Sequence, residues 1–252
     1  MTGAAWQDVD IDWPDGLHVV QVGDLVHRGP DSLGVVLLAD RLIGLGVWTQ
    51  VVGNHEQQYV DTPRFDWPET IDPEASDLLR EWWGDGRMSA AAVLETEADD
   101  AWLITHAGLT AGFWEHGLGR PTTTDSLLAA LTEARNDGVL WHPGRMLTGD
   151  VDRNAGPVWA EAGFEVYPSW LDVDALMPFH QIHGHSTAYW WDRRAWRCDR
   201  RVRRYAIADE RTRHVTFDLR GGRIVGIDPG HALDPAPAHA PLLIEDAIVR
   251  TR

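Results

Sequence analysis

Four segments of the chain, each predicted as a strand, run directly into a polar side chain that can bind a metal ion. The pairs of segment and side chain are 17–23 with Asp24, 47–53 with Asn54 and His55, 101–105 with His106, and 179–184 with His185. Short apolar runs of this kind are typical of buried strands. In α/β proteins the ligand lies at the carboxyl ends of the strands, so we expect these side chains to gather at one site.

A helix is predicted between the first two strands. The stretch "DSLGVVLLADRLIGLG" has apolar residues at helical spacing, and Gly44 and Gly46 supply its stop. Residues 17–53 therefore form a strand–helix–strand unit, in which the crossover requires parallel strands. The pattern predicts an α/β fold class.

The rest of the chain adds three features. Residues 61–100 are acidic, rich in proline and tryptophan, and are predicted as an insertion of short helices. Residues 124–138 form an amphipathic pattern that predicts a further helix. Alternating strands around Gly221-Gly222 predict a hairpin in a second, antiparallel sheet region. Without repeats or a clear linker, residues 1–252 are interpreted as a single domain.

Composition excludes several classes of protein. The formal net charge is −17, whereas binding to nucleic acid or to an anionic membrane requires a basic face. All 22 basic residues are arginine, so any phosphate clamp must be a guanidinium fork. The single Cys198 excludes an internal disulfide and fits a reducing compartment. With no apolar run of about 20 residues and no secretory signal pattern, a cytoplasmic location is expected.

The candidate ligands are oxygen and nitrogen donors without sulfur. Such a set suits divalent metals, with manganese as the first expectation and iron, zinc or cobalt as alternatives. Each residue alone is weak evidence, because a strand-end aspartate is more often a turn residue and a buried histidine is more often part of the core. The ordered motifs "GD", "GNHE", "THAG" and "HGHS" together favour a metal site.

These motifs resemble those of the calcineurin-like metallophosphoesterases. Within that superfamily, "GDLVHRGPDS", "GNHE", "HAG" and the late "GH" are most similar to the branch of Ser/Thr protein phosphatases and bacterial symmetrical dinucleoside tetraphosphatases. The resemblance implies a four-layer αββα sandwich of two mixed sheets flanked by helices. It also implies a site for two divalent metal ions.

The resemblance assigns a role to each matching residue. Asp24 would bridge both metal ions, and His55 would be the general acid that protonates the leaving oxygen. Arg28 would clamp the substrate phosphate. The remaining ligands of one metal position would be Asn54, His106 and His185.

The family's first motif, Asp-x-His-Gly, does not occur upstream of Asp24. Asp8, Asp10 and Asp12 are poor substitutes for this motif, because too few residues separate them from Asp24 for a strand and crossover. We therefore expect that the first strand is missing from the chain, through a late start or a real loss. A complete site would hold two metal ions, and this chain is expected to hold one. Four ligands of one metal position are present, whereas the other position keeps only the bridging Asp24.

Two further positions depart from the family pattern. His27 stands where the protein phosphatases have an aspartate that orients the acid histidine, and a neutral His27 could still accept a hydrogen bond from His55. It could alternatively contact the second metal position. In "HGHS", Thr187 takes the place of a second histidine, and His183 is interpreted as a structural neighbour of the site.

The predicted function is metal-dependent hydrolysis of a phosphoester or pyrophosphate bond by direct attack of activated water. The expected partner is a small phosphorylated substrate, such as a dinucleoside polyphosphate or a phosphomonoester. Two alternatives stay open, a Ser/Thr-type protein phosphatase and a catalytically impaired domain that binds one metal ion. Arg145 and Arg153 are candidates for a second phosphate contact.

Overall fold

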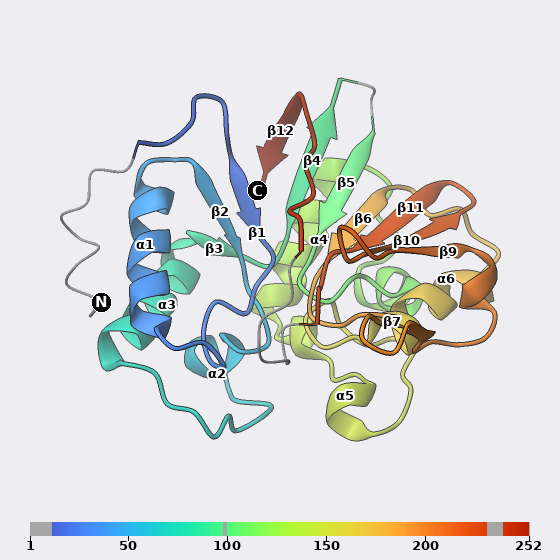
Figure 1. Cartoon of the computed structure of the whole chain (residues 1–252), viewed down its shortest axis with the longest axis horizontal. Helices are drawn as coiled ribbons and strands as arrows, with labels where there is room; N and C mark the ends of the chain where they lie inside the picture. Colours follow the sequence, from blue (N-terminus) through green and yellow to red (C-terminus); the bar gives the residue numbers. More distant parts are fainter. Residues whose placement is uncertain (1–11, 98–99, 231–238, 252) are drawn as a thin grey trace. The chain divides into compact units, whose positions relative to one another are not determined.

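The computed structural model describes residues 12–97, 100–230 and 239–251. The chain divides into two compact units, Met1–Ser89 (unit 1) and Ala90–Arg252 (unit 2). Figure 1 follows the chain through both units with its helices and strands labelled. The single domain inferred from the sequence stays a prediction.

Unit 1 is built on a small parallel sheet of order β1-β2-β3. Its elements are β1 (Val19–Gln21), α1 (Ser32–Gly44), β2 (Trp48–Val51), α2 (Gln57–Val60), α3 (Pro73–Asp85) and β3 (Met88–Ser89). Val19 of β1 pairs with Trp48 of β2 in parallel register, so the predicted strand–helix–strand unit is confirmed. Helix α1 begins where the Asp31 carboxylate accepts the Gly34 N–H at 2.8 Å, a typical N-cap.

Helices α1 and α3 pack together beside this sheet. The buried indole of Trp82 on α3 donates to Asp40 Oδ1 on α1 at 2.7 Å, which satisfies its polar N–H. Helix α3 ends at Gly86, whose left-handed φ of 82° favours glycine. Only this part of residues 61–100 forms a long helix. The prediction of a purely helical insertion is therefore wrong for its second half, where β3 and the first strand of unit 2 lie.

Unit 2 contains a seven-stranded mixed sheet of order β12-β4-β5-β6-β11-β10-β9. Its strands are β4 (Ala92–Thr96), β5 (Ala101–Ile104), β6 (His180–His183), β9 (Ala206–Asp209), β10 (His214–Leu219), β11 (Gly222–Gly226) and β12 (Ala247–Arg250). The predicted hairpin is present, with Leu219 opposite Gly222. However, it belongs to the same sheet as β5 and β6, because β11 pairs in parallel with β6. The predicted antiparallel region is confirmed in β9, β10 and β11, and it is one part of this mixed sheet.

Helical segments and a small hairpin complete unit 2. They are η2 (Phe113–Gly117), α4 (Thr124–Asn136), η3 (Val139–Trp141), α5 (Arg145–Thr148), η4 (Ala162–Val166), α6 (Tyr167–Asp172), η5 (Val202–Arg204), β7 (Tyr189–Trp190) and β8 (Ala195–Trp196). The predicted helix at 124–138 corresponds to α4, whose apolar face is buried through Leu127 and Leu131. Within the described ranges, no helix has the length and apolar character needed to cross a membrane. The α/β fold class is confirmed.

Candidate functional site

The predicted site residues of unit 1 lie where β1 and β2 end side by side. Because the two strands are parallel neighbours, the loop after β1 brings Asp24 next to the loop after β2, which carries Asn54 and His55. The His55 backbone N–H donates to Asp24 Oδ1 at 3.2 Å. Its side-chain Nε2 lies 3.6 Å from Asp24 Oδ2. The structure therefore brings Asp24 and His55 together as a carboxylate–imidazole pair.

Glu56, the last residue of "GNHE", holds both loops together, a role that the sequence pattern does not predict. Its side chain is fully buried, with 0% exposed. Oε2 accepts the backbone N–H groups of Asp24 and Gly53, each at 2.8 Å, and Oε1 accepts that of Leu25 at 2.7 Å and that of Val26 at 3.3 Å. A buried carboxylate is stable only with such hydrogen bonds. The sequence feature that could have indicated this role is an acidic residue in the loop that follows a buried strand.

Gly53 is required by the close approach of these two loops. A Cβ atom at this position would lie 2.4 Å from the Asp24 backbone nitrogen and 2.6 Å from Glu56 Oε2. Both distances are far inside van der Waals contact, so no other residue fits without a shift of the loops. The glycine of "GNHE" therefore has a steric role that complements the hydrogen bonds of Glu56.

The backbone is strained at several predicted site residues. Among the described residues, eight that are not glycine have a positive φ, and they include Asp24 (61°), His27 (67°), Arg28 (57°) and His185 (64°). A left-handed conformation costs energy for a residue with a side chain and persists where the surrounding structure enforces it. Such strain clusters at functional sites, and half of these eight positions coincide with residues that the motifs had singled out.

His55 is held by hydrogen bonds on its Nδ1 side. This nitrogen lies 3.1 Å from the Val26 carbonyl oxygen, which can only accept, so Nδ1 carries the hydrogen. His27 Nδ1 lies 3.2 Å from His55 Nδ1, and His27 Nε2 lies 2.7 Å from the Tyr59 hydroxyl. Burial lowers the pKa of His27 and so favours its neutral form, although the charge of the nearby Glu69 partly opposes this shift. A neutral His27 can accept from His55, as the sequence analysis expected.

Arg28, the predicted phosphate clamp, is exposed and lies over an aromatic ring. Its guanidinium carbon is 5.3 Å from the centre of the Trp67 ring, and its backbone N–H donates to Glu69. Across residues 12–97, 100–230 and 239–251, no carboxylate forms an ion pair with this guanidinium. The charge of Arg28 is therefore available to an anion.

Unit 2 brings together the other two predicted ligands. Strands β5 and β6 are parallel neighbours, and His106 and His185 follow their carboxyl ends. The Gly184 N–H donates to the His106 carbonyl oxygen at 2.8 Å, which fixes the two loops. His106 Nε2 and His185 Nδ1 are 3.0 Å apart. Two imidazole nitrogens that converge in this way can bind one metal ion, for which Zn–N distances are about 2.0–2.1 Å.

His183 belongs to the core of unit 2. Its Nε2 lies 3.0 Å from the Tyr167 hydroxyl and its Nδ1 lies 2.9 Å from the Gly184 carbonyl oxygen. Complete burial lowers the pKa of His183 to about 4, so the side chain is neutral at pH 7. These contacts support the interpretation of His183 as a structural neighbour that positions the Gly184–His185 turn.

The donors present in each unit fit a divalent metal ion. Unit 1 offers the Asp24 carboxylate and the Asn54 amide, and unit 2 offers the imidazoles of His106 and His185. Oxygen and imidazole donors without thiolate suit manganese, iron, zinc or cobalt. Asp12 lies exposed in an irregular segment, whereas Asp8 and Asp10 lie outside the described residues.

The two arginines considered for a second phosphate contact are paired with carboxylates. Arg145 donates to the buried Glu161 Oε2 at 2.6 Å. Arg153 donates to Asp172 Oδ2 at 2.9 Å. Each positive charge is thus largely balanced, which weakens the case for either residue as a phosphate ligand.

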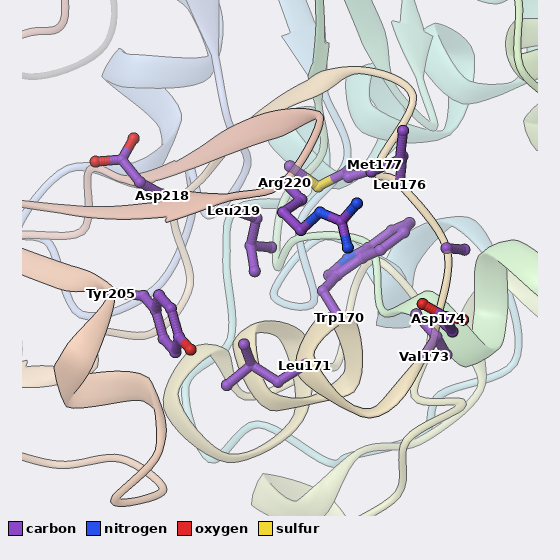
Figure 2. Close-up of a pocket in the computed structure, with 11 residues that line it drawn as sticks. Trp170, Leu171, Val173, Asp174, Leu176, Met177, Tyr205, Asp218, Leu219 and Arg220 are labelled. Atoms are coloured by element: carbon purple, nitrogen blue, oxygen red, sulfur yellow. The ribbon is translucent and has the colours of Figure 1, made fainter.

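Unit 2 also contains a cavity of about 480 Å³. Figure 2 shows its lining, with Trp170 and Arg220 near the middle. The walls come from α6, the segment that follows it, and the turn between β10 and β11. These segments lie at the beginning of β6, whereas His185 follows its end. None of the predicted site residues lines this cavity.

Comparison with known families assigns the chain to a class. The family model of the calcineurin-like phosphoesterases matches residues 4–189, which is most of the chain. The chain belongs to the calcineurin-like phosphoesterase family, as its motifs had indicated. Membership implies metal-dependent hydrolysis of phosphoesters, and the family uses divalent metal ions. A search of curated proteins found no match.

Proposed function

We propose that this chain hydrolyses a phosphoester or pyrophosphate bond of a small phosphorylated substrate, by direct attack of water. Dinucleoside polyphosphates and phosphomonoesters are the proposed substrates. The observation that carries the proposal is the arrangement in unit 1, where the imidazole of His55 lies beside the Asp24 carboxylate with Nε2 to Oδ2 at 3.6 Å. The family to which the chain belongs supports the reaction class.

His55 acts as the general acid in this proposal. Nδ1 is engaged by the Val26 carbonyl oxygen and His27, so the proton for the leaving oxygen comes from Nε2. When that proton leaves, the neutral ring keeps its Nδ1 hydrogen bonds and its orientation. His27 and Tyr59 hold the ring in place and are positioning residues.

Arg28 binds the phosphate through its exposed guanidinium. A guanidinium fork matches two phosphate oxygens and stays charged at all relevant pH values. Stabilisation of charge that develops on phosphate oxygens is a large contribution to catalysis of phosphoryl transfer.

The proposed metal ligands are Asp24, Asn54, His106 and His185, with manganese as the first candidate. When bound, the metal acidifies an attacking water and stabilises the charge on the attacking and leaving oxygens. The four residues supply two oxygen and two nitrogen donors, a set that suits such an ion. Elemental analysis of the Mn²⁺-loaded chain measures whether it binds one ion or two. A cytoplasmic location is also proposed, on the basis of the single cysteine, Cys198.

Two measurements on the full chain test this function. The first is metal per chain after loading with Mn²⁺ and desalting, for the wild type, Asp24→Asn and His185→Asn. The second is hydrolysis of a panel that contains dinucleoside tetraphosphates, aryl phosphates and phosphopeptides. Asp24→Asn should abolish turnover, and Asp15→Asn, which removes an exposed carboxylate of the same unit, should not.

The outcomes separate the alternatives. Faster cleavage of dinucleoside polyphosphates than of phosphopeptides supports the proposal, and the reverse order favours a protein phosphatase. Bound metal without turnover of any substrate favours an impaired metal-binding domain. Metal-dependent turnover that survives Asp24→Asn would overturn the assignment of the site.

A further inference from the structure

Residues 61–69, "DTPRFDWPE", form a loop that packs against the proposed acid and phosphate clamp within unit 1 (the 61–69 loop). Its first part is held by Gln57, which has 1% of its surface exposed. Gln57 Nε2 donates to the Thr62 carbonyl oxygen at 2.7 Å, and Gln57 Oε1 accepts the Arg64 N–H at 3.1 Å. A buried glutamine with both ends of its amide engaged fixes the course of the loop.

The last part of the loop is tied to both catalytic loops. The Trp67 indole Nε1 lies 3.4 Å from the Asn54 carbonyl oxygen, at the end of β2. Glu69 Oε2 accepts the backbone N–H of Arg28, after β1. The loop is therefore fixed against the site through Trp67 and Glu69, although every residue of 61–69 except Trp67 is exposed.

Trp67 is the centre of an aromatic stack in this loop. Its ring centre lies 3.7 Å from that of His55, with an angle of 31° between the planes. The Arg28 guanidinium lies over the same ring system, 5.3 Å from its centre. Trp67 thus contacts both the proposed acid and the proposed phosphate clamp, which a random surface tryptophan would not do.

Phe65 extends this stack to the surface. Its ring lies 4.8 Å from Trp67 in an edge-to-face arrangement, and it is 42% exposed. Aromatic side chains of this size are normally buried, and an exposed one offers a face on which a second ring can stack. The Trp67 ring therefore lies close to three groups, which are a guanidinium for phosphate, an imidazole for the leaving oxygen, and the exposed ring of Phe65.

We propose that Phe65, supported by Trp67 and Arg28, forms a leaving-group subsite that binds a flat aromatic ring attached to the phosphate. The inference rests on the proposed function and deepens it, because it names the residues that select the leaving group. Arg28 binds the phosphate, and the ring stacks on Phe65. Stacking on an aromatic side chain accepts any flat ring, so a nucleobase and a simple aryl group share this chemistry.

The test compares ligands that differ only in the ring. Binding of AMP and of ribose 5-phosphate to the Mn²⁺-loaded full chain is measured by titration calorimetry, which needs no turnover. Both ligands carry the same sugar phosphate, so the ratio of their dissociation constants isolates the base. Phenyl phosphate and propyl phosphate form a second pair, which separates an aryl source of the ring from a nucleoside source.

We expect AMP to bind about tenfold more tightly than ribose 5-phosphate, from the usual effect of one stacked base. Phe65→Ala should remove that preference and leave the affinity for ribose 5-phosphate unchanged. Phe65→Tyr should retain the preference because it retains the ring. Leu45→Ala, which removes an apolar side chain of unit 1 that is 56% exposed, should change neither affinity and is the matched control.

The results distinguish this inference from the proposed function. A ring preference that Phe65→Ala removes supports the subsite, even if none of the substrates is hydrolysed. A wild type that binds both members of each pair equally, or a preference that survives Phe65→Ala, overturns the subsite and leaves the hydrolytic function untouched. A preference in the phenyl pair alone identifies the ring as an aryl ester.

Discussion

Replacement of Glu56 by glutamine is the most direct test of how unit 1 holds its site together. Glutamine has nearly the shape of glutamate, so packing is conserved while one acceptor oxygen becomes an amide NH₂ group. In the wild type each carboxylate oxygen accepts two backbone N–H groups, Oε2 from Gly53 and Asp24 and Oε1 from Leu25 and Val26. Whichever way the amide turns, two N–H groups lose their acceptor and face another donor.

The magnitude follows from burial. The Glu56 side chain has 0% of its surface exposed, so water cannot replace the lost acceptor. A buried donor left without a partner costs about 1–3 kcal/mol, which gives a loss of about 2–6 kcal/mol for two donors. A domain is stable by only about 5–15 kcal/mol, so the effect is a large fraction of the total.

The assay is urea unfolding of the metal-free protein, followed by far-UV circular dichroism. Removal of metal matters because a bound ion would add its own stabilisation to one variant and not to the other. Glu133→Gln is the control, since it makes the same chemical change on the exposed side of α4 and should alter stability by less than about 0.5 kcal/mol. If Glu56→Gln unfolds at the same urea concentration as this control, the carboxylate does not hold the two loops and the reasoning fails.

Three other predictions concern the same loops. Gly53→Ala would place a Cβ atom 2.4 Å from the Asp24 backbone nitrogen, so we expect a lower unfolding temperature and weaker Mn²⁺ retention, measured by thermal unfolding and elemental analysis. His27→Asp would put a carboxylate beside His55 Nδ1 and stabilise the protonated ring, so the alkaline limb of the pH–rate profile should move to higher pH. Excess Mn²⁺ at about 100 times its dissociation constant should stabilise the folded wild type by about 2.7 kcal/mol, seen as a higher unfolding temperature, and Asp24→Asn should lose this gain.

The strand ends were the part of the fold that sequence predicted best. Short segments with apolar residues that end at a polar, metal-capable residue located β1, β2, β5 and β6. The pairing of strands into sheets could not be predicted in the same way. Strands β1 and β2 lie in the three-stranded sheet and β5 and β6 in the seven-stranded sheet, and no local pattern tells which strand pairs with which.

The missed residues share a physical reason. Glu56 is an acidic residue in a motif, and its importance comes from four backbone N–H groups that converge on it from two loops. Trp67 lies in an acidic, proline-rich stretch without periodicity, where composition suggested surface. Its contacts with His55 and Arg28 arise because Gln57 and Glu69 fold the loop back. Such contacts depend on loop conformation, which sequence patterns describe poorly.

The net charge of the chain does not reveal where a phosphate would bind. At −17 the chain should repel phosphates, and its arginines offered several possible clamps. Pairing decides among them, because Arg145 and Arg153 each bind a carboxylate, whereas the guanidinium of Arg28 lies on an aromatic ring that neutralises none of its charge. A phosphate therefore gains most at Arg28, beside the imidazole that would protonate its leaving group. In this acidic chain, a guanidinium that forms no ion pair with a carboxylate indicates an anion site more strongly than the number of basic residues does.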